Sequence, residues 1–240
     1  MKVNWNIIKG IVLLGSVGFL VGFSYEKNKA VKISEIDVEF EDGSNLFMDY
    51  QMVNKLLIQN GKTVKNQPKS VIDLHNLEAN VISHPMVESA SVFLTVDGLL
   101  KTKIKQRTPI ARVITQNKSY YIDSQAKTMP LSENHSARVL LISGDIKETD
   151  NEQIHLLVSK IMGDGFLKKQ IIAVEKINKN EFVLIMRVGD QKVEIGKIEN
   201  LDSKFKNLNS FLNKTMSDQT IDNYASINLE YNNQVVCTKK

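Results

Sequence analysis

The sequence of 240 residues predicts an α+β protein with three parts: an N-terminal transmembrane helix, a small domain with the order β-α-α-β-β, and a mostly antiparallel β domain with packed helices. Three observations support this fold class. The chain opens on a long apolar stretch, helix-like and strand-like periodicities alternate up to about residue 106, and short strand-like segments dominate the rest. We therefore expect two separate cores behind one membrane segment.

The apolar stretch runs from Trp5 to Tyr25 and carries Lys9 as its single charge. As a helix it would extend roughly 31 Å, close to the thickness of the hydrocarbon core of a bilayer. Trp5 and Tyr25 lie where interfacial aromatic residues anchor such a helix. The pattern predicts a short tail at residues 1–6, a transmembrane helix at 7–24 and a linker at 25–31.

Two properties of this segment stay open on sequence grounds. Gly22 and Ser24 also form a small-residue site at which a signal peptide could be cleaved. Lysines lie on both sides of the segment, so the positive-inside rule does not choose an orientation. We predict an uncleaved anchor because of the length of the segment and its flanking aromatic residues.

The first domain is predicted over residues 32–106. Apolar and acidic residues alternate up to Phe40, which indicates a half-buried strand. Asp49 and Asp73 each precede a helical periodicity and are expected to cap two short helices, with a loop at 60–70 between them. The residues expected to face inward are Met52, Val53, Leu56 and Leu57 in the first helix, and Leu74, Leu77, Val81 and Ile82 in the second.

His84 and Pro85 are expected to end the second helix, because the residue before a proline avoids helical backbone angles. An extended segment follows, with Ala90, Val92, Leu94 and Val96 predicted on one face. Asp97-Gly98 is a strong hairpin signal, and Leu100, Thr102 and Ile104 alternate with lysines in the return strand. His84 is therefore interpreted as a turn residue rather than as part of a chemical site.

The second domain is predicted over 107–237, with a tail at 238–240. Short strands are expected within 109–131 and 138–144. The stretch from Thr149 to Glu152 matches a capping box ahead of a helix. Two further strands joined through Gly189-Asp190, an amphipathic helix from Leu201 and a final strand or pair of strands complete the domain. The helix faces expected to be buried are Ile154, Leu157, Val158, Ile161 and Met162, and Leu201, Phe205, Leu208, Phe211 and Leu212.

Composition and motifs give no positive evidence for chemistry. Lys and Arg exceed Asp and Glu by only four, which argues against nucleic acid as the main ligand, and the single cysteine, Cys237, excludes an intrachain disulfide. The four histidines lack metal-ligand spacing, and no nucleophile elbow or phosphate loop occurs. We predict no catalytic, metal or cofactor residues. Because exposed sheet edges recruit extended partners, the pattern favours a binding role.

The stretch Leu77–Val113 has a helix, a strand, a return strand and a short motif between the two domains. The residues that mark it are Pro85, Val87, Ala90 and Val92 in the first part, and Arg107, Pro109 and Ala111 in the motif between the two domains. This pattern resembles the cell-division protein family FtsQ/DivIB, which has a helix, then Pro-aromatic-Val, a small-residue strand, a return strand and Glu-Arg-x-Pro-x-Ala. Two positions depart from the family's pattern, since Met86 replaces the usual Trp and Gln106 the usual Glu.

Three later segments are similar to the same family in the same order. "SYYIDSQAKTMPL" keeps the aspartate of the family's turn at Asp123, with Gln125-Ala126 in place of the glycine region. "VEIGKIENLDSKFKNLNSFL" matches a strand ending at Gly196 and a helix that carries Lys204. "INLEYNNQVV" is similar to the closing segment, with Asn228 in place of Asp and Glu230 in place of Arg.

The resemblance implies that 32–106 is a POTRA domain and 107–237 an FtsQ-type β domain. It implies a non-enzymatic scaffold of the bacterial divisome, linking early division-ring proteins to septal peptidoglycan synthesis. The partners would be FtsB/FtsL-type proteins, with the FtsK, FtsW and FtsI class as further candidates, and the lipid bilayer through one helix. No cofactor, nucleic acid or small-molecule substrate is implied. The positions matching the family's strand-addition site are Tyr231, Asn233, Gln234, Val235 and Val236.

The resemblance further implies a single-pass protein of the cell inner membrane at the division septum, with a cytoplasmic N-terminus and a periplasmic bulk. The strand at 87–96 is a second candidate surface. Three alternatives stay open: a POTRA-containing periplasmic assembly or secretion factor, a secreted binding protein released by signal cleavage, and a periplasmic hydrolase. A hydrolase would need a cleft in which ionisable groups of perturbed pKa converge.

Overall fold

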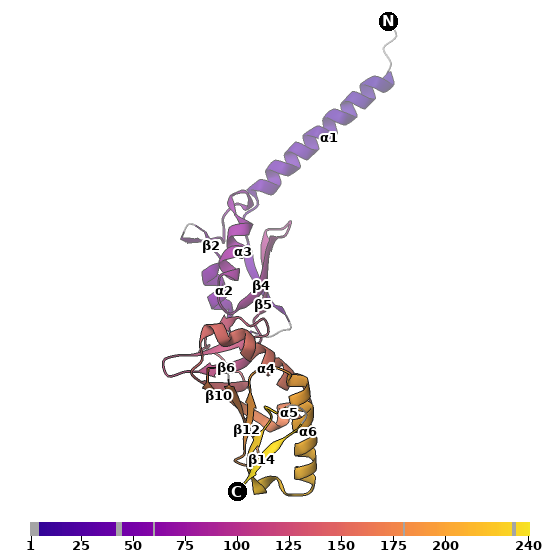
Figure 1. Ribbon diagram of the computed structural model, residues 1–240. Coiled ribbons are helices and arrows are strands. Elements are labelled where there is room, and N and C mark those ends of the chain that lie inside the picture. Colours follow the sequence, from indigo (N-terminus) through magenta and orange to yellow (C-terminus); the bar gives the residue numbers. More distant parts are fainter. Residues whose placement is uncertain (1–4, 42–44, 60, 180, 232–233) are drawn as a thin grey trace. The chain divides into compact units, whose positions relative to one another are not determined.

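The computed structural model describes residues 5–41, 45–59, 61–179, 181–231 and 234–240 (Figure 1). The chain forms two compact units, Met1–Gln106 and Arg107–Lys240. Each unit builds its own main sheet, of three strands in the first and nine in the second. The predicted α+β class is confirmed, because strands and helices are mixed in both units.

The chain begins with a long helix, α1 (Trp5–Ala30). Its part from Ile8 to Ala30 is long and apolar enough to cross a membrane. The helix begins inside the predicted tail at 1–6 and continues through residues 25–30 of the predicted linker, so most of that linker is helical. The physical reason is that no proline or glycine lies between Tyr25 and Ala30, and Lys27 and Lys29 suit the negative end of the helix dipole.

The first unit has the predicted order of strand, helix, helix, strand, strand. Its elements are β1 (Glu35–Phe40), α2 (Tyr50–Leu56), α3 (Leu74–Ile82), β4 (Val87–Leu94) and β5 (Leu99–Gln106). The sheet order is β1-β5-β4, with β5 parallel to β1 and antiparallel to β4. The predicted loop also holds part of a small hairpin, β2 (Ile58–Gln59) with β3 (Lys62–Thr63), and a 3₁₀ turn, η2 (Lys69–Val71).

Both predicted helix caps are present. The Asp49 carboxylate accepts a hydrogen bond from the Met52 N–H at 2.7 Å, and the Asp73 carboxylate accepts one from the Asn76 N–H at 3.0 Å. The expectation that Ile82 faces inward is wrong, because Ile82 is exposed while its neighbour Val81 is buried. Successive helical residues lie about 100° apart around the axis, so Ile82, the last residue of α3, lies to one side of the face that Leu77 and Val81 bury.

The second unit has a nine-stranded sheet of order β14-β13-β12-β11-β10-β9-β6-β7-β8. The pairs β6–β9, β9–β10 and β12–β13 are parallel and the other pairs are antiparallel. The strands are β6 (Pro109–Ile114), β7 (Ser119–Asp123), β8 (Thr128–Met129), β9 (Leu140–Gly144), β10 (Ile171–Asn178), β11 (Glu181–Met186), β12 (Lys192–Gly196), β13 (Tyr224–Asn228) and β14 (Val236–Lys239).

Helices complete the core of the second unit. They are α4 (Asn151–Gly163), α5 (Leu167–Gln170) and α6 (Leu201–Ser217), with the 3₁₀ turns η3 (Glu148–Asp150) and η4 (Ile221–Asn223). Buried residues of α4 and α6 such as Leu157 and Leu208 share one apolar core with the sheet. Met162, predicted to be buried in α4, is instead exposed. It lies one helical turn beyond the buried Val158, in the last turn of α4, where the helix extends past the core.

The predicted capping box at Thr149 is wrong. Thr149 lies within η3, and the carboxylate of the next residue, Asp150, accepts a hydrogen bond from the Lys147 N–H at 2.8 Å. The same carboxylate forms an ion pair with Lys176 of β10 at 2.6 Å. The Asp150 carboxylate thus contacts both the chain just before the helix and a strand residue 26 positions away in the sequence.

Candidate functional site

The last strand, β14, lies at one edge of the nine-stranded sheet. It hydrogen-bonds to β13 in antiparallel register, with Val236 opposite Asn228 and Thr238 opposite Ser226. No strand among the described residues pairs with its other side. A strand with one free side presents backbone N–H and C=O groups to which an extended segment of another protein can add.

The residues predicted to bind a partner are distributed over this edge and the connection before it. Tyr231, Gln234 and Val236 are exposed, and Val236 is the first residue of β14. Val235 is half-buried and packs against the apolar core of the unit. Asn233 lies outside the described residues. The exposed members are therefore available for contact, whereas Val235 contributes to packing.

The strand β12, two strands in from β14 in the sheet, is held by α6. The Lys204 ammonium is buried and donates hydrogen bonds to the carbonyl oxygens of Ile195 at 2.7 Å and Lys197 at 2.8 Å. Burial lowers the pKa of Lys204 from its ordinary value of 10.5. The Leu229 N–H in turn donates to the Glu194 carbonyl at 2.8 Å. Lys204, which the resemblance singled out, thus ties α6 to β12, the strand that borders β13.

Replacing Lys204 with methionine is expected to lower the free energy of unfolding by about 1–3 kcal/mol, because two carbonyl groups lose this donor. Because burial lowers the pKa of Lys204 below 10.5, the ammonium loses its proton at a lower pH in the folded chain than in the unfolded chain. The difference in free energy of unfolding between the native chain and the variant should therefore increase as the pH rises toward 10.5. Urea titrations of both full-length chains at neutral and alkaline pH measure this; an equal loss in the exposed Lys206→Met control would contradict it.

The second candidate surface, β4, has an outer edge that is already partly occupied. The Val92 N–H donates to the Glu78 carboxylate of α3 at 3.0 Å. A charged side chain that occupies an edge amide opposes pairing with another strand. Sequence reasoning missed Glu78, because its role depends on how α3 packs against β4. Of the motif residues on this strand, Val87 and Val92 are buried and Ala90 is half-buried, so these side chains contribute to packing.

The neighbouring turn contains His84 and Pro85. The helix α3 ends at Ile82, and the His84 N–H still donates to the Val81 carbonyl at 3.2 Å. The Nδ1 atom of His84 accepts a hydrogen bond from the Met86 N–H at 3.3 Å. Burial lowers the pKa of His84, which favours the neutral ring that this contact needs. The interpretation of His84 as a turn residue agrees with these contacts.

Arg107 and Asp123 form a buried ion pair in the second unit. Arg107 Nη1 lies 2.7 Å from Asp123 Oδ2, and the two side chains are 12% and 1% exposed. The other carboxylate oxygen, Oδ1, accepts hydrogen bonds from the N–H groups of Gln125 and Lys127, both at 2.8 Å. The resemblance chose these two residues from separate motifs, and the fold brings them together at the β6–β7 pair. Pro109 begins β6, and Ala111 is buried within it.

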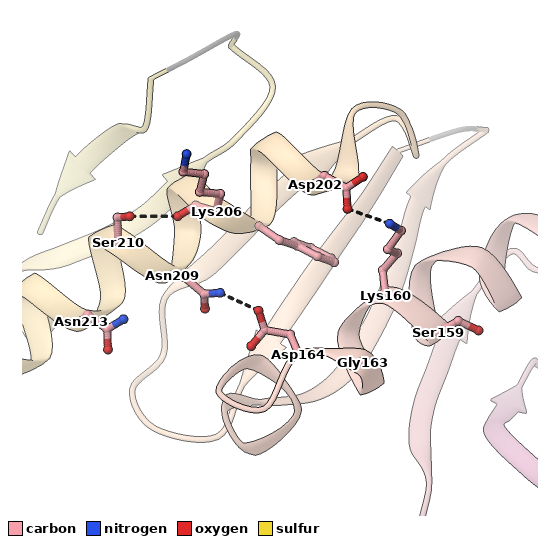
Figure 2. A pocket seen from close by; sticks show the side chains of 10 residues that line it. Ser159, Lys160, Gly163, Asp164, Asp202, Lys206, Asn209, Ser210 and Asn213 are labelled. Carbon is pink, nitrogen blue, oxygen red and sulfur yellow. Dashed lines mark hydrogen bonds and ion pairs between the residues drawn. The ribbon is translucent and has the colours of Figure 1, made fainter.

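A hollow of about 530 Å³ between α4 and α6 contains the clearest cluster of charged groups (Figure 2). Lys160 pairs with Asp202 at 2.7 Å, and the Asn209 amide donates to the Asp164 carboxylate at 2.6 Å. Asp164 also accepts hydrogen bonds from the N–H groups of Phe166 and Leu167. The Leu167 hydrogen bond is the main reason that the pKa of Asp164 is lowered.

Both carboxylates of this hollow therefore have structural partners, and Asp164 acts as a cap for the start of α5. A general acid–base pair requires two titratable groups whose environments push their pKa values apart, and the hollow does not offer one. In the described part of the chain, no group of three or more His, Cys, Asp or Glu side chains is placed to hold a metal ion. The hydrogen bonds and the ion pair of these side chains stabilise the fold, and their geometry does not favour proton transfer.

Comparisons with known proteins agree with the division into two units. A family model described as "FtsQ/DivIB, C-terminal related" matches residues 108–238, and a model of the POTRA-like domain matches residues 32–105. A search of curated proteins returned no match. Among solved structures, the major extracytoplasmic domain of the trans isomer of the bacterial cell division protein DivIB from Geobacillus stearothermophilus aligns with 48% of this chain and 98% of its own, at 8% identity and a TM-score of 0.33. Because the first family model spans more than half of the chain, the protein belongs to the FtsQ/DivIB family of cell-division proteins.

Proposed function

We propose that this protein is a non-enzymatic scaffold of the division machinery that binds FtsB/FtsL-type proteins by strand addition at β14. Family membership supports the role in division. The open side of β14 and the exposed side chains of Tyr231 and Val236 support the mode of binding. Backbone hydrogen bonds along the edge would supply affinity, and contacts with alternate side chains would supply selectivity.

We further propose that α1 anchors the scaffold in the inner membrane, with a cytoplasmic N-terminus and the remaining chain in the periplasm. The length and apolar composition of α1 support the anchor. Residues 32–106 would act as the POTRA domain and residues 107–237 as the β domain that carries the partner site. The partly occupied edge of β4 makes the first unit the weaker candidate for strand addition.

Depletion of the protein is expected to give filamentous cells with blocked septation, because the scaffold links early ring proteins to septal wall synthesis. A tagged full-length copy should form a band at midcell, and fluorescence microscopy measures both outcomes. Normal division after depletion would exclude the proposed function.

The localisation of the tagged copy also distinguishes the proposed scaffold from the alternative functions. An even signal around the cell periphery, with normal division, would favour a POTRA-containing assembly or secretion factor. Loss of the mature protein from washed membranes, with a shortened N-terminus, would identify a secreted binding protein. Peptide mapping of the N-terminus from membrane fractions distinguishes the two.

A further inference from the structure

A second surface of the unit Arg107–Lys240 has no role in the proposed strand addition. It is a hollow of about 600 Å³ at the ends of α4 and α6, beside α5 and the turn after β11. We call it the cationic hollow and define it by Met162, Lys168, Lys169, Arg187, Val188 and Met216. It combines exposed apolar side chains with three cations, and no carboxylate lines it.

The apolar part arises because two buried helix stripes continue into solvent. Met162 follows the last buried residue of the α4 stripe, and Met216 lies one helical turn beyond Leu212 of the α6 stripe. Met162 is 46% exposed, Met216 36% and Val188 55%. Methionine side chains adapt to irregular partners and are common at surfaces that bind peptides. Together the three side chains give the hollow a small apolar surface that a bulky apolar side chain of a partner can contact.

The cations around the hollow are not neutralised by the described part of the chain. Lys168 and Lys169 are exposed and form no ion pair with a described residue. The two carboxylates nearest in sequence are engaged elsewhere: Asp164 accepts from Asn209, and Asp190 pairs with Lys240 at 2.7 Å. The local excess of positive charge therefore remains to attract an anionic group.

Arg187 is held in place while part of its guanidinium stays available. Its backbone N–H donates to the Gln170 carbonyl at 2.6 Å, and its Nε donates to the Lys169 carbonyl at 2.7 Å. The two terminal nitrogens make no hydrogen bond with a described residue. A guanidinium fixed in this way has lost part of its conformational freedom beforehand, so binding a carboxylate would cost less entropy.

We propose that the cationic hollow binds an acidic, amphipathic segment of a partner protein. One or two bulky apolar side chains of that segment would enter the hollow between the methionines, and its carboxylates would pair with Arg187, Lys168 and Lys169. The lining of the hollow favours a protein segment over a lipid surface. The residues that enter a bilayer from a protein surface are typically protruding aromatic side chains, which the hollow lacks.

The test uses the full-length protein in phosphatidylcholine nanodiscs and a peptide made of glutamate and leucine, whose N-terminus is blocked by acetylation beforehand. Acetylation of Lys168 and Lys169 by acetic anhydride, read by mass spectrometry, reports occupancy of the hollow. We expect at least tenfold slower acetylation at saturating peptide, unchanged acetylation of Lys206, and a loss of protection as salt is added. The charge reversals Lys168→Glu with Lys169→Glu, and separately Arg187→Glu, should weaken peptide binding at least tenfold, measured by fluorescence anisotropy, whereas Lys206→Glu should not.

Three outcomes would overturn the proposal. Equal binding of a glutamine–leucine peptide would show that charge is not recognised. Protection of Lys168 and Lys169 by phosphatidylglycerol nanodiscs without peptide would assign the hollow to the membrane surface. If Lys168 and Lys169 are not protected from acetylation at any peptide concentration, the hollow does not bind an acidic segment. None of these results bears on binding at β14, so the two proposals fail independently.

Discussion

Replacing Asp123 with alanine is expected to lower the free energy of unfolding of the second unit by about 3–5 kcal/mol. The substitution leaves the Arg107 guanidinium, 12% exposed, without its carboxylate partner. It also removes the acceptor of the Gln125 and Lys127 N–H groups. A buried charge that loses its partner is among the most destabilising changes a single substitution can make.

Hydrogen exchange of the full-length chain, followed by mass spectrometry over β6 and β7, measures this loss in the second unit alone. Asp145→Ala is the matched control, because Asp145 is exposed and forms no ion pair with a described residue. The double variant Arg107→Met with Asp123→Leu should recover part of the stability, since neither charge is then left alone. A loss below about 0.5 kcal/mol for Asp123→Ala, as for an ordinary surface substitution, would contradict the buried pair.

Replacing Val236 with glutamate is expected to reduce co-purification of FtsB/FtsL-type partners at least tenfold, because it places a charge where a partner strand would lie beside β14. Val236 is exposed, so the stability of the unit should change by less than about 0.5 kcal/mol. Tyr231→Glu should act in the same direction. Val235 is a poor choice for such a test, since its side chain packs against the core and a charge there would destabilise the fold.

Ile114→Glu is the matched control for this experiment, because Ile114 is an exposed strand residue on β6 rather than on the β14 edge. It should leave co-purification unchanged. Binding that survives both Val236→Glu and Tyr231→Glu, in chains with native stability, would remove β14 as the partner site. Membership of the family would stand, since it rests on the match over residues 108–238.

Features set by neighbours in the sequence were predictable. Asp49 and Asp73 cap their helices because each carboxylate reaches an N–H group three residues ahead. The turn at Asp97-Gly98 follows from a backbone in which Gly98 has φ of 92°, which glycine adopts without strain. The strand-helix-helix-strand-strand order of the first unit follows from such signals and from the apolar periodicity between them.

Elements that depend on distant partners were missed or misjudged. The strand β10 was not predicted, and it lies in the middle of the sheet between β9 and β11. Thr149 gave a plausible capping signal, but it lies within η3, and α4 begins after Asp150, whose carboxylate pairs with Lys176 of β10. Periodicity also placed Ile82 and Met162 inside, although both lie in the last turn of their helices and are exposed.

By itself the sequence determined the apolar N-terminal segment, the class of both units, the helix caps and the motifs that placed the chain in its family. It also predicted a partner site in the closing segment. Only the tertiary structure decided that β14 is an edge strand, that Arg107 meets Asp123, and that Glu78 occupies an edge amide of β4. It also brought two methionines and three cations together in one hollow. The reason is physical: caps and turns are hydrogen-bonded within a few residues, whereas edges, ion pairs and hollows depend on which distant segments pack side by side.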